Sequence, residues 1–303
     1  MKRRHLISIT DLTPEEVGVV IQRAMAMKQD GHGKPLAGKS VAMLFEKPSL
    51  RTKVSFDVGI QQLGGHALYL GREEVGLGGR EPVADVVRVL SRYVDAVVAR
   101  VFSHQVLEEL AKHGTVPVIN ALSDAEHPCQ VLADLLTVRE HKGRLEGVTI
   151  AFIGDGNNVS ASLALGAVSV GANFVIASPK GYELPQSLIA EAWRIASATE
   201  SSIRQVRRPQ EAAAGADVVY TDVWASMGDE AELAARRKAF QGYQVNPDLM
   251  RLANPDAIFL HDLPAHGGEE ISVGMLEHPQ SVVFDQAENR LHAQKAALEF
   301  LLG

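Results

Sequence analysis

Short apolar runs alternate with longer amphipathic stretches along almost the whole chain. In the first half the apolar runs lie at 40–46, 66–70, 95–101 and 116–121. Helical patterns lie between them at about 50–63, 82–93, 104–113 and 128–141. Short runs with so few polar residues are typical of strands buried on both faces. The first half therefore predicts a parallel sheet covered by helices.

A second series of apolar runs follows, at 148–154, 173–179, 202–206, 216–223 and 257–263. Helical patterns separate these runs too, the clearest being PQSLIAEAWRIASA. This alternation predicts the α/β class, with two doubly wound domains that each hold a parallel sheet flanked by helices. The polar stretch 139–147, with two glycines, is the best linker candidate, so we expect domains at 1–140 and 141–285. The final helix, expected near 286–302, could pack on either domain.

The start of the first helix is marked in the stretch TPEEVGVVIQRAMAM. Thr13 precedes Pro14, and Glu16 lies three residues after Thr13, which is the spacing of a capping box. We therefore expect a helix that begins at Pro14.

The composition is that of an ordinary globular protein, with 46% hydrophobic and 22% charged residues among 303. The net charge of −7 gives no sign of the basic surface that nucleic-acid-binding proteins present. A few local arginines can still bind a small anion. The single cysteine, Cys129, excludes an intramolecular disulfide and fits a reducing compartment. No segment resembles a signal peptide or is apolar over the roughly 18 residues that span a membrane. We expect a cytoplasmic protein without membrane or nucleic-acid partners.

Polar side chains gather just past the predicted strand ends, where open parallel sheets bind their ligands. They lie at 49–53, 100, 127–130, 155–158, 222–227 and 261–264. Their common placement supports a shared site better than any one of them alone.

The stretch EKPSLRTKVSF places Ser49, Arg51, Thr52 and Lys53 where a strand turns into a helix. The free N–H groups and positive dipole of a helix N-terminus, with hydroxyls and a guanidinium, favour a phosphate or carboxylate site. A capped helix with a solvated basic turn is the alternative. Arg100, at the end of an apolar run, belongs here only if it joins the same anion; otherwise it is an ordinary surface or ion-pair residue.

The stretch EHPCQVLADLLT starts another helix, with His127 and Gln130 three residues apart and hence on one face. An imidazole and an amide can both hold a carbonyl oxygen or an NH2 group. A helix cap with a satisfied histidine is the alternative interpretation. Cys129 has no obvious activating neighbour, so we expect it to pack rather than to react.

Three later stretches carry further candidates. FIGDGNNV resembles a dinucleotide loop but has Val159 at the third glycine's position, so Asn157 and Asn158 could instead hydrogen-bond a small polar ligand. Asp222, in TDVWASMG, could hold an ammonium group or form an Asx turn. Arg290, early in the last amphipathic helix, is by itself best interpreted as a solvated side chain.

Taken together, these stretches resemble the aspartate/ornithine carbamoyltransferases, and the ornithine branch in particular. The matching pieces, in order, are FEKPSLRTKVSF, EPVADVVRVLSRYVDAVVAR, HPCQVLADLLT, GDGNNV, DVWASMG, HDLPAHGGEE and QAENRLHAQKA. Several motifs in the right order over nearly the whole chain make this signal specific.

The resemblance implies transfer of the carbamoyl group of carbamoyl phosphate to the side-chain amine of L-ornithine, giving L-citrulline and phosphate. It implies a carbamoyl-phosphate domain at 1–140, with the last helix (286–303) packing back on it, and an ornithine domain at 141–285. It also implies a homotrimer, or a multiple of trimers, with active sites shared between neighbours, and turnover without a metal or cofactor.

The resemblance also implies roles by position. The catalytic residues would be Arg51, His127, Asp262 and Arg290. The carbamoyl-phosphate site would consist of Ser49, Leu50, Arg51, Thr52, Arg100, His127, Gln130, Leu263 and Arg290. The ornithine site would consist of Asn158, Asp222, Ser226, Met227 and Asp262.

Asp262 is the main departure from the family pattern, because the family usually has His-Cys-Leu-Pro where this chain has His-Asp-Leu-Pro. A nearby carboxylate favours the ammonium form of the substrate and raises the pKa of its amine, which helps binding but opposes attack. We hypothesise that Asp262 faces this ammonium and accepts a proton as the amine attacks.

Three smaller departures bear on substrate affinity and choice. Lys53 replaces the usual arginine, Gly76 stands where a glutamine or histidine of the neighbouring subunit usually reaches carbamoyl phosphate, and Gly267 replaces a frequent arginine. One alternative is therefore carbamoyl transfer to another amine, such as putrescine or a modified ornithine. A second is a non-catalytic carbamoyltransferase-like binding protein. A nucleotide-dependent dehydrogenase, resting on GDGNNV alone, is the weakest.

Overall fold

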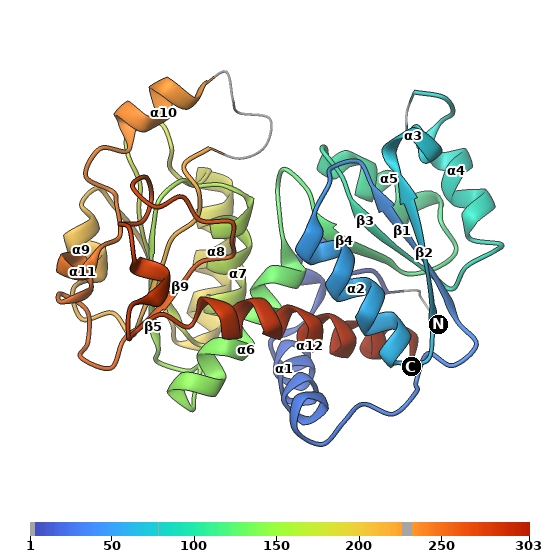
Figure 1. Ribbon diagram of the computed structural model, residues 1–303, viewed down its shortest axis with the longest axis horizontal. Helices are drawn as coiled ribbons and strands as arrows, with labels where there is room; N and C mark the ends of the chain where they lie inside the picture. Colours follow the sequence, from blue (N-terminus) through green and yellow to red (C-terminus); the bar gives the residue numbers. More distant parts are fainter. Residues whose placement is uncertain (1–3, 78, 226–231) are drawn as a thin grey trace. The chain divides into compact units, whose positions relative to one another are not determined.

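The structure, a computed structural model, describes residues 4–77, 79–225 and 232–303 (Figure 1). The chain forms two compact units. One consists of Met1–Ala133 together with Asn289–Gly303, and the other consists of Asp134–Glu288. Two helices, α6 (Pro128–Lys142) and α12 (Val283–Leu302), each contribute residues to both units.

The first unit is built on a four-stranded parallel sheet with the order β2-β1-β3-β4. Its strands are β1 (Ser40–Phe45), β2 (His66–Gly71), β3 (Ala96–Arg100) and β4 (Val118–Leu122). Its helices, besides its parts of α6 and α12, are α1 (Pro14–Gln29), α2 (Leu50–Gln62), α3 (Arg72–Val75), α4 (Val83–Leu90) and α5 (His104–His113), with the 3-10 helix η1 (Ile9–Asp11).

The second unit is built on a five-stranded parallel sheet with the order β7-β6-β5-β8-β9. Its strands are β5 (Thr149–Ile153), β6 (Asn173–Ala177), β7 (Ile203–Val206), β8 (Val218–Tyr220) and β9 (Ile258–Leu260). Its helices are α7 (Asn158–Ser169), α8 (Gln186–Thr199), α9 (Pro209–Ala213), α10 (Leu233–Ala239) and α11 (Pro247–Met250), with the 3-10 helix η3 (Met275–Glu277).

Each sheet reverses its strand order at one point, between β1 and β3 in the first unit and between β5 and β8 in the second. Loops that leave such a switch point diverge to opposite faces of the sheet and open a crevice at the carboxyl ends of the strands. The polar residues picked out from the sequence follow β1, β3 and β4 in the first unit and β5, β8 and β9 in the second, so the topology groups them into one cluster in each unit.

The predicted α/β class, with two parallel sheets flanked by helices, is confirmed, and each predicted strand is present. The capping box at Thr13 is also confirmed, since Thr13 Oγ1 accepts from the Glu16 N–H and the Glu16 carboxylate accepts from the Thr13 N–H. The structure differs at 139–142, predicted as linker, which form the last turn of α6. Basic residues such as Arg139 and Lys142 are stabilised at a helix C-terminus, so polarity alone did not mark a break there.

Strands β8 and β9 are shorter than the predicted runs 216–223 and 257–263. In both places the strand ends where the polar residues begin, because Asp222 and His261 engage local backbone N–H groups instead of a neighbouring strand. Within the described residues no helix is both long and apolar enough to cross a membrane.

Candidate active site

The N-terminus of α2 carries the first cluster of polar groups. Ser49 caps the helix: its Oγ accepts a hydrogen bond from the Thr52 N–H at 3.3 Å and donates to Thr52 Oγ1 at 3.0 Å. Leu50, the first helical residue, has a side chain that is 77% exposed, so only its backbone N–H is suited to hold an anion. The first turn thus presents N–H groups at the positive end of the helix dipole.

Arg290 of α12 joins this cluster from the far end of the sequence. Its Nη2 donates to Thr52 Oγ1 at 2.6 Å, and its Nη1 donates to Gln130 Oε1 at 2.5 Å. All three side chains are buried. The interpretation of Arg290 as a solvated side chain is therefore wrong, since the tertiary fold turns its side of α12 toward α2 and α6.

His127 lies buried in the same unit, just before α6. Burial lowers its pKa well below the ordinary value, and the positive charges of Arg290 and Arg100 lower it further. Its imidazole is therefore neutral at pH 7, with one N–H donor and one acceptor nitrogen. Arg100, which ends β3, is also buried, whereas Arg51 is half-buried and has no hydrogen bond or ion pair among the described residues.

Cys129 packs beside this cluster without a chemical role. Its Sγ donates a hydrogen bond to the Asn120 carbonyl at 3.3 Å. Burial raises the pKa of the thiol to about 12, and the nearby Arg290 charge offsets only part of that rise. A thiol that stays protonated is a poor nucleophile.

The second cluster lies at the switch point of the other sheet and is centred on Asp222. Asp222 Oδ2 accepts a hydrogen bond from Asn157 Nδ2 at 2.7 Å, and its Oδ1 accepts from the Val223 N–H at 2.6 Å. Asn157 also caps α7, because its Oδ1 accepts from the N–H groups of residues 159 and 160. Asn158 follows as the first residue of α7 and is half-buried.

The glycines of the GDGNNV stretch have a packing explanation. A Cβ on Gly156 would lie 2.4 Å from the backbone of Glu183 and Leu184. Only glycine fits so close an approach, so this glycine does not require a bound nucleotide.

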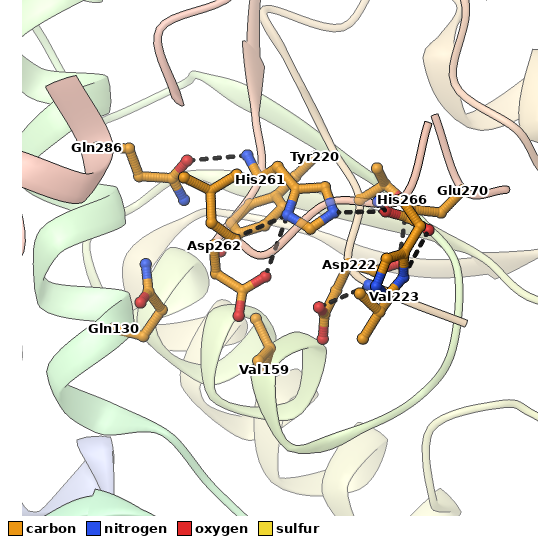
Figure 2. Close-up of polar contacts among 12 residues, drawn as sticks. Gln130, Val159, Tyr220, Asp222, Val223, His261, Asp262, His266, Glu270 and Gln286 are labelled. Atoms are coloured by element: carbon orange, nitrogen blue, oxygen red, sulfur yellow. Dashed lines mark hydrogen bonds and ion pairs between the residues drawn. The ribbon is translucent and has the colours of Figure 1, made fainter. Parts of the chain in front are cut away.

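His261, at the end of β9, holds the loop that carries Asp262 (Figure 2). The ring of His261 is fully buried; its Nδ1 accepts from the Leu263 N–H at 2.9 Å, and its Nε2 lies 3.2 Å from Glu270 Oε1. Its own backbone N–H donates to Gln286 Oε1 at 2.8 Å. Because Nδ1 accepts, Nε2 carries the proton and donates to Glu270. Leu263 has a φ of 59°, in the left-handed region that non-glycine residues rarely adopt.

Asp262 lies close to Asp222. Both are members of a group whose ligand atoms all lie within 4.8 Å of one another, and the Asp262 side chain is 14% exposed. Tyr220, at the end of β8, is fully buried, and its OH donates to Asp134 at 3.3 Å. Burial raises the pKa of Tyr220 well above its usual value, and the carboxylates of Asp134, Asp262 and Asp222 raise it further. Two carboxylates facing a common point favour a cationic group between them.

Several supporting residues were not predicted from the sequence. Gln286 bridges the His261 backbone to Asp134, donating from Nε2 to Asp134 Oδ1 at 2.7 Å. Gln286 and Glu270 lie 25 and 9 residues from His261 in the chain. No short-range pattern links such positions, so only the fold brings them together.

Arg236 of α10 is a further residue that the sequence analysis missed. Its Nη1 donates to Asp155 Oδ2 at 2.5 Å and to the Trp224 carbonyl at 3.0 Å. The guanidinium also lies over the Tyr182 ring, 5.1 Å from its centroid. Arg236 therefore ties the loop after β5 to the loop after β8, the two loops that carry Asn157 and Asp222.

The remaining predicted positions have simpler descriptions. Ser226 and Met227 lie outside the described residues. Gly76 ends α3 with a φ of 56°, a left-handed conformation that favours glycine. Lys53 Nζ lies 3.5 Å from the centroid of the Tyr69 ring, a cation–π contact that keeps the charge at α2 without a guanidinium fork. A Cβ on Gly267 would meet Val273 at ordinary van der Waals distance, so a larger residue fits there.

Comparison with known proteins agrees with this architecture. A family described as aspartate/ornithine carbamoyltransferase, carbamoyl-P binding domain, matches residues 4–140, and its Asp/Orn binding domain matches residues 146–301. An ornithine carbamoyltransferase of Acidothermus cellulolyticus is 54% identical over 99% of this chain and 96% of its own length. The chain belongs to the aspartate/ornithine carbamoyltransferase family.

Solved structures show the same likeness. An ornithine carbamoyltransferase from Pyrococcus furiosus matches with a TM-score of 0.95 and 49% identity, over 99% of this chain and 97% of that one. An acetylornithine transcarbamylase complexed with acetylcitrulline matches with a TM-score of 0.89 and 32% identity, over 99% of each chain.

Proposed function

We propose that the protein is an enzyme that transfers the carbamoyl group of carbamoyl phosphate to the side-chain amine of L-ornithine, giving L-citrulline and phosphate. The family membership and the full-length similarity to ornithine carbamoyltransferases support this activity. The structural observation that carries it is the buried chain Thr52–Arg290–Gln130, which lies in the same unit as a neutral histidine, His127. These side chains can donate hydrogen bonds to the carbonyl oxygen of the carbamoyl group. None of the four is a carboxylate, so none of them would repel a phosphate.

The first unit, which we assign to carbamoyl phosphate, has separate groups for the phosphate and for the carbamoyl part. We assign the phosphate to the first turn of α2, through Ser49, the Leu50 N–H, Arg51 and Thr52, together with Arg100. A dianion is stabilised there by the helix dipole and by guanidinium groups that form charge-assisted hydrogen bonds. Arg51 suits this role because, among the described residues, no carboxylate neutralises it.

We assign the binding of the carbamoyl group to His127, Gln130 and Arg290. Attack on its carbonyl carbon builds negative charge on the oxygen, and each donor fixed around that oxygen can be worth roughly 2.7–4 kcal/mol. A neutral His127 can donate to this oxygen or accept from the NH2 group.

The second unit, which we assign to ornithine, uses Asn158, Asp222, Ser226, Met227 and Asp262. The amine must lose a proton before it can attack. If its pKa is near that of lysine, about 10.4, deprotonation at pH 7 costs on the order of 4.6 kcal/mol. Because Asp222 and Asp262 raise that pKa further, attack also needs a group that takes the proton away.

Asp262 is the proposed acceptor. It removes one proton from the substrate ammonium, and the amine nitrogen then forms its bond to the carbamoyl carbon. The carbon–oxygen bond to phosphate breaks, and the leaving phosphate takes the second proton of the nitrogen. Asp222 is less suited to this role because both of its oxygens already accept hydrogen bonds, from Asn157 and from a backbone N–H.

A modified ornithine is the second candidate for the amine. Asp262 in place of the usual cysteine motivates it, and so does the similarity in fold to an acetylornithine transcarbamylase. The identity to that protein is 32%, against 54% to an ornithine carbamoyltransferase, so ornithine remains the better-supported substrate.

The test is citrulline formation from carbamoyl phosphate with L-ornithine, N-acetylornithine and putrescine compared under the same conditions. We expect strong activity with L-ornithine alone. Activity with only one of the other amines would move the specificity to that amine. No turnover with any of them, with carbamoyl phosphate still bound, would support a binding protein.

We also propose a cytoplasmic homotrimer or a multiple of it. A row of exposed apolar residues on α2, Leu50, Val54 and Val58, lies at i, i+4 and i+8 and offers a surface for a second copy. Light scattering would test it: a mass of one chain, 32.7 kDa, would contradict the proposal. The buried free thiol of Cys129 is consistent with a reducing location.

A further inference from the structure

A second group of metal-ligating side chains lies beyond the proposed ornithine site, in the turn after Asp262. His266, Glu269 and Glu270 offer three ligand atoms that all lie within 4.8 Å of one another. Figure 2 shows His266 beside Glu270, on the far side of His261 from Gln286. Both residues follow the loop that Asp262 begins, and we assign none of the three to either substrate.

Glu270 places a buried carboxylate in this group. Its side chain is fully buried, and its Oε1 accepts from the His266 N–H at 2.5 Å and from His261 Nε2 at 3.2 Å. Its Oε2 is buried without a hydrogen-bond partner among the described residues. A buried carboxylate is costly unless it is paired with a cation and its oxygens are hydrogen-bonded.

The oxygen that lacks a hydrogen bond lies near His266. Glu270 Oε2 lies 3.8 Å from His266 Nδ1, too far for a hydrogen bond. Two ligands on a tetrahedral zinc ion with bonds of about 2.1 Å lie about 3.4 Å apart. A small movement of the His266 ring, which is 53% exposed, would therefore bring both atoms to ligand distance.

Glu269 completes the set with a carboxylate that is already oriented. Arg237 Nη2 pairs with Glu269 Oε1 at 2.5 Å, so the side chain is held in place. Carboxylates that ligate metals are commonly held by such outer hydrogen bonds. The carboxylates of Glu269 and Glu270 carry two negative charges, and Arg237 supplies one positive charge. The remaining negative charge favours a cation at this point.

The neighbouring group of Asp222, His261 and Asp262 is the other candidate for a metal site, and it offers fewer free ligand atoms. The His261 Nδ1 lone pair accepts from the Leu263 N–H, and Nε2 carries the proton donated to Glu270. Neither ring nitrogen has a lone pair left for a metal. That group therefore offers only two carboxylates, which we assign to the substrate ammonium.

We propose that His266, Glu269 and Glu270 form a site for a divalent transition-metal cation of the Zn²⁺ type. One imidazole and two carboxylates are ligands that zinc accepts, with water in the fourth position. The cation neutralises Glu270 and braces the turn after Asp262. The site does not depend on the proposed carbamoyl transfer, and no step of that reaction passes through it.

The experiment is a titration of the chelator-treated full-length protein with Zn²⁺ against a chromophoric chelator. We expect one equivalent to bind with a rise in the unfolding temperature. The same preparation, titrated with Co²⁺, should develop the visible absorption of a four-coordinate N/O site. We expect His266→Ala and Glu269→Gln each to weaken binding by at least about 10-fold.

Two matched variants separate this site from others. Asp262→Asn damages the competing group, and His66→Ala removes an exposed histidine of β2 in the other unit. Both should leave the Zn²⁺ affinity within about twofold of the unaltered protein. The proposal is overturned if the unaltered protein binds no equivalent of Zn²⁺. It is also overturned if Asp262→Asn abolishes binding while His266→Ala and Glu269→Gln leave it intact.

Discussion

Two side chains lie in opposite electrostatic surroundings that decide what they can do. Asp262 lies beside a second carboxylate, Asp222, where the substrate ammonium is proposed to bind. His127 lies among buried arginines, where the same electrostatics keep its imidazole neutral. The carboxylates of Asp262 and Asp222 attract the substrate ammonium, and a proton must then be removed from it. The neutral imidazole of His127 and the arginines around it suit an anionic substrate.

Replacing Asp262 by Asn removes the proton acceptor and keeps the shape. We expect kcat to fall on the order of 10²–10⁴-fold, the usual contribution of a general base. The ornithine KM should rise, because one of the two carboxylates that attract the ammonium is lost. Steady-state kinetics would measure both constants. Asp262→Cys, which restores the usual family residue, is the matched control and should retain more activity. Unchanged kcat and KM in Asp262→Asn would contradict the role.

His127 should make stability depend on pH on the acid side of neutrality. Its pKa in the folded protein is well below the ordinary value, so below about pH 6.5 the unfolded chain binds a proton that the folded one does not. Stability is therefore full above about pH 6.5 and falls as the pH decreases, by up to about 1.36 kcal/mol per pH unit.

His127→Gln removes this contribution. We expect its urea unfolding midpoint to fall less between pH 7 and pH 5 than that of the unaltered protein. Comparing the two proteins cancels the other titrating groups, which they share. Parallel pH profiles would show that His127 is not buried as a neutral group.

At the scale of elements, helices and loops that follow different strands are held together by single side chains. In the first unit Arg290 of α12 joins α2 to α6. In the second, Arg236 of α10 joins the loop after β5 to the loop after β8. The side chains of the Arg236–Asp155 pair are only 13% and 15% exposed, so solvent screens it less than a surface ion pair.

Arg236→Met should loosen the proposed ornithine site. The variant keeps an unbranched side chain but loses the donors to Asp155 and Trp224 and the cation–π contact with Tyr182. We expect the ornithine KM to rise by about 10-fold, equivalent to about 1.4 kcal/mol, with the carbamoyl-phosphate KM unchanged. Arg236→Lys should restore part of the effect.

The control is Arg251→Met. Arg251 pairs with Asp248, and both side chains are more than 70% exposed, so its loss should change neither KM. A purely structural role for Arg236 would lower stability and leave the ratio of the two KM values unchanged.

At the scale of the whole molecule, the end of the chain completes the first unit. Residues 289–303 contribute Arg290 to the proposed carbamoyl-phosphate site. The same segment pairs Glu299 with Arg23 at 2.5 Å, Asn289 with Lys28 at 2.9 Å, and Lys295 with Gln62 at 3.0 Å. The first unit is thus built from both ends of the chain.

Deleting 289–303 should destabilise the first unit selectively. We expect hydrogen–deuterium exchange to rise throughout 4–133, because α2 and α1 lose the helix that covers them. Exchange in the strands of 149–260 should change little. Glu299→Gln, which breaks only the pair with Arg23, should affect α1 alone. An equal loss of protection in both units would contradict this assignment.

The sequence by itself determined the class of fold and pointed to most of the candidate site. Its alternating periodicity predicted two parallel sheets, because a strand buried on both faces must be apolar and the crossover between parallel strands must be a helix. Its motifs predicted His127, Gln130, Asp222 and Asp262, since functional side chains in open sheets follow the carboxyl ends of strands.

Tertiary structure alone decided which distant side chains hold that site. The local pattern around Arg290 is that of a solvated residue on an amphipathic helix, so only the family resemblance placed it in the site, and its burial depends on which face of α12 meets α2. Glu270, Gln286 and Arg236 carry no local signal of a supporting role. Periodicity is a property of neighbours within about one helical turn, whereas these contacts join residues whose separation in the chain is set by the fold.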